Sequence, residues 1–128
     1  MLGHTYRYHV YNGTGVSVTC TVKARAMKFA SDGSRTDDTE VTHINAVSVG
    51  AGAYSNSSTV DNSSDKMLGA DVQFVAAPGA SATGTVSLYL QRSTDGGTTW
   101  PANGYGQQIA AVYFAASSSS VTTQGAVR

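Results

Sequence analysis

The segment VSVTCTVKARAM at residues 16–27 decides the fold class of this chain. Apolar or small residues stand at every second position, and polar or charged residues fill nearly all the positions between them. A period of two sustained over twelve residues is typical of a β-strand with one buried face and one solvated face. We therefore predict a long strand whose inner face carries Val16, Val18, Cys20, Val22, Ala24 and Ala26.

The residues before this segment repeat the same pattern. Tyr6, Tyr8 and Val10 alternate with polar neighbours, and the sequence NGTG at residues 12–15 separates the two runs. Asn and Gly supply the positive-φ residues that a tight hairpin needs. The sequence thus predicts that the first two strands form an antiparallel pair.

Further strands follow along the rest of the chain. The segment 109–116 (IAAVYFAA) is apolar on both faces, which is typical of a strand in the middle of a sandwich or pressed against another subunit. Residues 50–65 are rich in Gly, Ser and Asn and predict a long, flexible, exposed loop. The other expected strands cover residues 41–49, 68–76, 85–91 and, as a short edge strand, 121–127.

The composition supports an all-β fold. Glu occurs once and Leu four times, whereas Ser, Thr and Val are abundant, so good helix formers are scarce and β-branched residues are common. With 128 residues and Gly-rich turns between short strands, residues 1–128 predict one domain. We expect a single antiparallel β-sandwich or jelly roll of about seven or eight strands.

Charge and hydropathy exclude several classes of partner. The formal net charge is zero and 12% of the residues are charged, so the basic surface of a nucleic-acid-binding protein is missing. The longest apolar stretch, 109–116, is far shorter than the roughly 20 residues of a membrane span, and the N-terminal residues do not resemble a signal peptide. We expect a soluble protein without its own export leader, and the single Cys20 to be a buried small hydrophobe.

No catalytic, cofactor or metal site is predicted. His4, His9 and His43 lack the spacing that places zinc ligands on one face, and the aspartates do not alternate densely enough for a calcium loop. The nucleophile elbow G-x-S-x-G is absent as well. We therefore expect a protein that is not an enzyme and that needs no cofactor.

The most specific local pattern is STDGGTTW at residues 93–100, which resembles the Asp-box S-x-D-x-G-x-T-W found in repeated copies in sialidases. In such a hairpin turn the Asp side chain accepts hydrogen bonds from backbone amides, Gly adopts a left-handed conformation and the aromatic ring packs over the turn. The resemblance covers eight residues and implies a structural role for Ser93, Asp95, Gly97 and Trp100.

Seven tyrosines are many for a chain of this size, and tyrosine favours interfaces because its ring buries area while its hydroxyl keeps a polar partner. The surface predicted to contact a partner consists of Tyr6, Tyr8, Ile109, Val112, Tyr113 and Phe114. In an alternative, Tyr54, Trp100 and Tyr105 form a platform on which sugar rings stack.

A neutral, Lys-poor sandwich has open sheet edges with few of the charges that protect them, which favours a place inside an assembly. Together with VSLYLQR at residues 86–92 and the Asp-box turn, this resembles small β-sandwich virion proteins of tailed bacteriophages. The resemblance implies a non-catalytic subunit, made in the host bacterial cytoplasm and present in many copies in the virion.

We expect a capsid decoration or cement protein that binds other virion proteins and is a homo-oligomer. Placement in the tail or fibre base is an alternative, as is a carbohydrate-binding module. A glycosidase fragment is disfavoured because it needs paired acids that the sequence does not place on facing strands.

Overall fold

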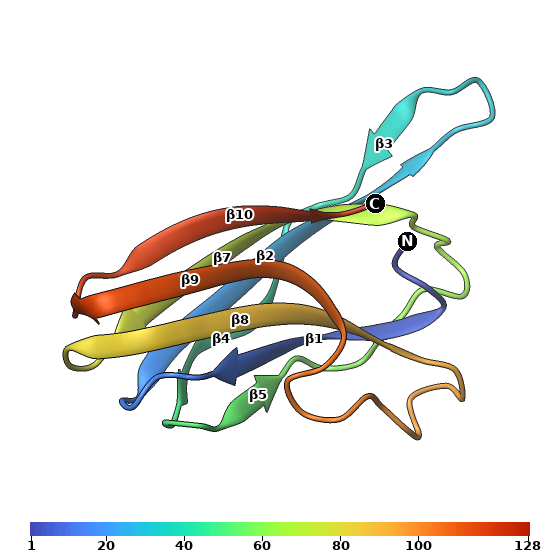
Figure 1. The fold of residues 1–128 in the computed structure, drawn as a ribbon. Helices are drawn as coiled ribbons and strands as arrows, with labels where there is room; N and C mark the ends of the chain where they lie inside the picture. The colour runs from blue at the N-terminus through green and yellow to red at the C-terminus, as the bar shows by residue number, and fades with distance from the viewer.

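The structure, a computed structural model, describes all 128 residues and contains ten β-strands and no helix. The strands form two antiparallel five-stranded sheets that face each other (Figure 1). The predicted all-β class and sandwich-like arrangement are confirmed. Seven strands have seven or more residues, and three more have two or three residues each, of which β5 and β6 lie in the segment 50–65 that we expected to be a loop. No helix long and apolar enough to cross a membrane is found.

The first sheet is built around two long central strands, β1 and β8, which pair along eight residues. The free side of β1 is covered in two places, by β5 near its end and by β6 near its start. The outermost strand on the other side is β9, which pairs with β8. The five strands are β5 (Tyr54–Asn56), β6 (Val60–Asp61), β1 (Thr5–Asn12), β8 (Ala82–Ser93) and β9 (Gln107–Ser117).

The second sheet repeats this arrangement around β2 and β7, which pair along ten residues. One side of β2 is covered by β4 and, farther along, by β3, while β10 pairs with β7 and forms the opposite edge. The five strands are β3 (Arg35–Asp37), β4 (Val41–Val49), β2 (Val18–Phe29), β7 (Gly69–Pro78) and β10 (Val121–Val127).

One hydrophobic core of 21 buried residues fills the space between the sheets. The alternation in β2 is confirmed at Val18, Cys20, Val22 and Ala24, which all point inward. Burying a side chain such as Phe74 of β7 stabilises the fold by about 1.5–3 kcal/mol. Burial also raises the pKa of the Cys20 thiol to about 12, so this cysteine is the inert hydrophobe that the sequence predicts.

The predicted hairpin of the first two strands is wrong, because β1 and β2 lie in different sheets. Both sides of β1 are already occupied by other strands. Buried Asn12 directs the segment between β1 and β2 across the sandwich. Its Nδ2 donates to the carbonyls of Val16, Val49 and Gly50 at 2.8–3.1 Å. In addition, the Gly13 amide donates to the Thr85 carbonyl. The turn-forming residues therefore make a corner between sheets and not a hairpin.

The long loop predicted over residues 50–65 is exposed along much of its length, but it contains regular structure that the prediction did not include. Short strands β5 and β6 lie within it and pair with β1. The side chain of Ser57 is buried and accepts a hydrogen bond from the Tyr8 amide at 2.9 Å. Buried Asn62 donates to the carbonyls of Gly3 and Met67. Polar residues that suggest a solvated loop thus serve as hydrogen-bonding anchors.

The apolar segment 109–116 does not lie in the middle of a sheet. It forms most of β9, an edge strand whose inner residues Val112 and Phe114 are buried and whose Tyr113 is 69% exposed. The expected edge strand at 121–127 is confirmed as β10. The two edge strands β9 and β10 lie side by side along one side of the sandwich (Figure 1).

The strand expected at residues 41–49 is confirmed as β4, and its residues do not alternate simply between core and solvent. Ala46 has a positive φ of 47°, and the pairing with β2 shifts register nearby. The Ala46 amide donates to the Thr21 hydroxyl at 3.1 Å instead of to a backbone carbonyl of β2. Ile44 and Val49 therefore point into the core, whereas Val41 and Val47 are exposed.

Candidate functional site

The turn that begins with Ser93 has the hydrogen bonds of an Asp-box. One Asp95 carboxylate oxygen accepts from the amides of Thr98 and Thr99 at 3.1 and 2.9 Å and from the Ser93 hydroxyl at 2.7 Å. The other oxygen accepts from the Thr99 hydroxyl at 2.6 Å. These bonds, led by the one from Thr99, hold the pKa of Asp95 well below its usual range. Asp95 therefore organises the turn as an acceptor and is not poised to exchange protons near neutral pH.

Gly97 and Trp100 also have the expected roles. Gly97 has a φ of 98°, and its amide donates to the Ser93 hydroxyl at 2.8 Å. The indole Nε1 of Trp100 donates to the Gly97 carbonyl at 3.1 Å, and its ring lies beneath the Arg7 guanidinium at 4.3 Å from the ring centroid. The Trp100 ring is thus held between the turn and β1.

The rest of the β8–β9 connection folds back over the outer face of the first sheet. Gln91, fully buried on β8, donates from Nε2 to the carbonyl of Tyr105 at 2.8 Å and accepts from Arg7 at 2.9 Å. His9, fully buried on β1, accepts from the Gly104 amide at Nε2, so its Nδ1 carries the proton and donates to Asn56 at 2.6 Å. These two polar side chains fasten the connection to the sheet.

Sequence reasoning missed His9 and Gln91 as anchors. Both stand at positions whose alternation predicts the solvated face of their strands, and nothing local indicates that a connection folds over them. Burial lowers the pKa of His9, which keeps the ring neutral and able to accept from Gly104.

The three residues proposed for sugar stacking lie on this same side of the molecule. Tyr54 and Tyr105 are 47% and 68% exposed, whereas Trp100 is half-buried and covered by Arg7. Buried His9 packs against Tyr54, with ring centroids 5.5 Å apart. None of the five surface pockets is lined by any of the three, so they share a face without forming a cleft.

The six residues proposed as a partner surface are divided by the structure. Tyr6, Tyr8, Val112 and Phe114 are buried between the sheets, so they do not lie on an exposed docking surface as predicted. The physical reason is the alternation of strand residues, which turns these four inward. Of the remaining two, Tyr113 is exposed on the outer side of β9, and Ile109 is half-buried beside β10.

A run of sequence without charged side chains forms one edge of the sandwich. Residues 96–127 include no Asp, Glu, Lys, Arg or His, and they contain both β9 and β10. Tyr113 is flanked on the outer side of β9 by exposed Ala111 and Ala115. We call these two strands the uncharged edge.

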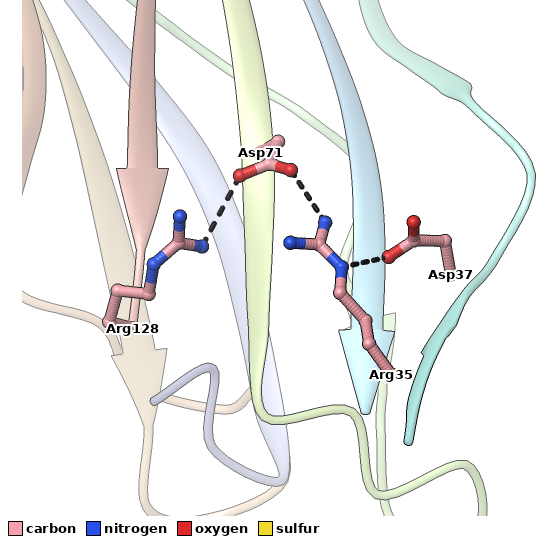
Figure 2. A network of polar contacts seen from close by, with 4 residues as sticks. All are labelled: Arg35, Asp37, Asp71 and Arg128. Carbon is pink, nitrogen blue, oxygen red and sulfur yellow. Dashed lines mark hydrogen bonds and ion pairs between the residues drawn. The ribbon is translucent and has the colours of Figure 1, made fainter. Parts of the chain in front are cut away.

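The outer face of the second sheet differs, because an ion-pair network crosses it (Figure 2). Asp71 of β7 accepts from Arg35 of β3 at 2.7 Å and from Arg128 at 3.2 Å, and Arg35 also contacts Asp37. Such exposed pairs add little to stability, because water screens them. They join β3, β7 and the C-terminal residue across the sheet and place charges over it.

Beside this network lies an open groove of about 310 Å³. Charges of both signs line it, with Lys23, Arg25, Glu40 and Asp71 among the lining residues. Lys23 and Glu40 approach each other at 3.9 Å. The groove has no aromatic wall on which a sugar could stack.

No three His, Cys, Asp or Glu side chains come close enough together to hold a metal ion. No protein-family model matches the chain, and no match was found among curated proteins or solved structures.

Proposed function

We propose that this chain is a non-catalytic structural protein of a bacteriophage virion, a capsid decoration or cement protein that docks onto shell subunits. The observation that carries this proposal is the uncharged edge, whose strands β9 and β10 lie within residues 96–127, a run of 32 residues without a charged side chain. Edge strands of soluble proteins are usually protected by charges, because an open edge pairs readily with another chain. An edge without them is suited to a permanent partner.

The opposite side of the sandwich, formed by β3 and β4, carries charged side chains. Arg35 and Asp37 lie on β3, and Asp38 and Glu40 follow directly before β4, so that side carries the charges that β9 and β10 lack. A protein that stays alone has no need for such asymmetry. We infer that β9 and β10 face neighbouring capsid subunits and that the charged side faces solvent.

The nesting of strand pairs supports the finer assignment of a jelly roll. Four antiparallel pairs alternate between the sheets in the order β8–β9, β7–β10, β5–β1 and β4–β2. A jelly roll is such a series of nested pairs, and this fold is common in viral capsid proteins. Here the series passes from β10 to β1 through the chain ends, so we assign a circularly permuted jelly roll.

A place in the tail or fibre base uses the same surface and differs only in the neighbouring subunit. A second candidate function, carbohydrate binding, is favoured by exposed Tyr54 and Tyr105 on one face of the first sheet. Sugar rings stack on such aromatic side chains, although the absence of a cleft limits this site to a flat platform.

The test compares the copy number of wild-type and variant protein in tailed-phage particles assembled from the genome that encodes this chain. Tyr113→Lys places a charge on the uncharged edge, and Val47→Lys, at a 38% exposed position of β4 on the opposite side, is the matched control. We expect wild-type and Val47→Lys protein in stoichiometric, symmetric copy number by quantitative mass spectrometry. The Tyr113→Lys copy number should fall at least ten-fold.

Two results would contradict the proposal. One is wild-type protein that never associates with particles, and the other is equal loss in both variants. Glycan binding by the isolated protein that is lost in Tyr105→Ala would favour the carbohydrate-binding alternative, and a capsid- or tail-specific location in the particle decides between the two virion positions.

A further inference from the structure

A partly enclosed pocket of about 90 Å³ lies between the two sheets on the side opposite the uncharged edge. Its walls come from β1 and β6 of the first sheet, from β2 and β4 of the second, and from the segments beside them. Its volume equals the room of about three water molecules. We call it the inter-sheet pocket, and the residues that give it chemical character are Tyr6, Tyr8, Asp38, His43, Asp61 and Asp65.

Three aromatic rings form one wall of the inter-sheet pocket. Tyr6 and Tyr8 meet edge to face with centroids 5.9 Å apart, and the His43 ring lies 4.7 Å from that of Tyr8. Aromatic faces attract cations because their π-electrons carry partial negative charge. Burial lowers the pKa of His43, so this ring is neutral at pH 7 and adds no positive charge.

The Tyr8 hydroxyl is the only buried side-chain polar atom of the chain without a hydrogen-bond partner. Tyr8 is fully buried, and its side chain lines the inter-sheet pocket. Buried polar groups in native proteins are nearly always paired, so each exception calls for a partner. A donor bound in the pocket would supply one.

The charge of the pocket is negative. Asp38, Asp61 and Asp65 line it together with no Lys or Arg. The ammonium of Lys28 donates to the backbone carbonyl of Asp65 at 3.5 Å and makes no ion pair with the three carboxylates. Burial is the main cause that raises the pKa of the Tyr6 hydroxyl, and the negative charges of Asp38 and Asp65 raise it further.

The carboxylates surround the pocket without converging on one point. Asp61 Oδ1 is already engaged by the Ser63 amide at 2.9 Å, and no three acidic or histidine side chains approach closely enough for a metal ion. A divalent metal needs such convergent oxygens, whereas an alkylammonium group needs aromatic faces, a hydrogen-bond acceptor and diffuse negative charge. The pocket supplies the second set.

We propose that the inter-sheet pocket binds a compact alkylammonium group, which donates a hydrogen bond to the Tyr8 hydroxyl and is balanced by Asp38, Asp61 and Asp65. The group can belong to a free small amine or to a lysine side chain of another molecule. This inference is independent of the virion role, because the pocket and the uncharged edge lie on opposite sides of the sandwich.

The test is an NMR titration of the full chain with ethylammonium chloride, in parallel with 1-propanol as a neutral probe of similar size and with calcium chloride. We expect saturable shifts of the Tyr8 and His43 ring signals with ethylammonium alone. A short peptide with one lysine distinguishes the two sources of the ammonium group, and the same peptide with acetyl-lysine is its uncharged control. Tighter binding of the lysine peptide than of ethylammonium indicates a macromolecular lysine, and weaker binding indicates a free amine.

Variants test the residues themselves. The double change Asp38→Asn and Asp65→Asn should weaken ethylammonium binding at least ten-fold, whereas Asp37→Asn, at a neighbouring exposed carboxylate outside the pocket, should leave it unchanged. Tyr8→Phe removes a hydroxyl that has no partner, so it should fold normally and bind several-fold more weakly. Absence of saturable shifts, equal shifts with 1-propanol, or wild-type affinity in the double variant or in Tyr8→Phe overturns the proposal.

Discussion

A single carboxylate organises the turn between β8 and β9. Asp95 accepts four hydrogen bonds from three residues within a span of seven, so the backbone of the turn closes around it. Its folded-state pKa lies below the usual value because these bonds favour the ionised form. The ionised carboxylate therefore stabilises the folded state above the pKa of the unfolded chain, and this contribution is lost as the pH falls toward the folded-state pKa.

We predict that Asp95→Asn lowers stability at pH 7 and that the difference from wild type shrinks below about pH 4, the usual range of an aspartate. The reason is that protonated Asp95, like asparagine, is a poorer acceptor for these donors. Urea unfolding of both proteins at pH 7, 4 and 2.5 measures the difference. A gap that stays constant over this range would contradict the assigned role.

His9 plays a comparable part for the connection that covers the first sheet. Its Nε2 accepts from the Gly104 amide, and a proton bound there would remove this bond. Burial is the main reason that its folded-state pKa is lowered from 6.5. The neutral ring therefore stabilises the folded state above pH 6.5, and the contribution is lost as the pH falls below that value.

We predict that the Gly104 amide exchanges faster with solvent as the pH is lowered from 7.5 to 5, after correction for the intrinsic exchange rate. His9→Gln keeps an acceptor on a similar side chain but does not titrate, so its Gly104 amide should stay protected. Hydrogen exchange followed by NMR makes the comparison, and His43 remains in both proteins as a common background. The same pH response in both would assign the effect to another group.

At the scale of elements, the uncharged edge depends on how closely β10 approaches β9. A Cβ atom added at Gly125 would lie 2.6 Å from the Ile109 carbonyl oxygen and 2.7 Å from its side chain. The absence of a side chain at Gly125 thus lets the two edge strands lie against each other although they belong to different sheets.

We predict that Gly125→Val destabilises the protein by about 1–3 kcal/mol, the usual cost of overpacking. Gly15→Val is the control, because no atom lies within 4 Å of a Cβ at Gly15. Chemical denaturation gives both values. Equal effects of the two substitutions would show that backbone entropy, and not contact between β9 and β10, decides the outcome.

At the scale of the whole molecule, the described chain ends meet. The Met1 ammonium donates to the Arg128 carbonyl, and Arg92 also donates to the Met1 carbonyl. The nested strand pairs continue through this point, from β10 to β1. The link between β2 and β4 contains the exposed turn at Ser31–Ser34 and is held by few buried groups.

We predict that a circular permutant with a short Gly/Ser linker from Arg128 to Met1 and new ends at the exposed turn before Gly33 folds to the same structure. A second permutant opened between Asn12 and Val16 should be much less stable, because it frees the buried Asn12 corner. Circular dichroism and thermal unfolding distinguish them. Similar stability of the two would contradict the role of that corner.

Local alternation made much of the fold accessible from the sequence. Strands β2, β4, β7, β8 and β10, the inner faces of β2 and β7, and the Asp-box turn depend on neighbouring residues, because the period of a strand and the chemistry of a turn are local properties. The same alternation also turns Tyr6, Tyr8, Val112 and Phe114 inward. The prediction that placed these four residues on a partner surface did not take their inward position into account.

What only the tertiary structure decided is which strands pair and which polar residues become buried. The sequence NGTG at residues 12–15 is equally suited to a hairpin or to a corner, and the choice was made by distant partners, the Thr85 and Val49 carbonyls. The anchors His9, Gln91 and Asn62, and the inter-sheet pocket, arise in the same way. Residues far apart along the chain meet there, and alternation within one strand carries no information about what will lie across from it.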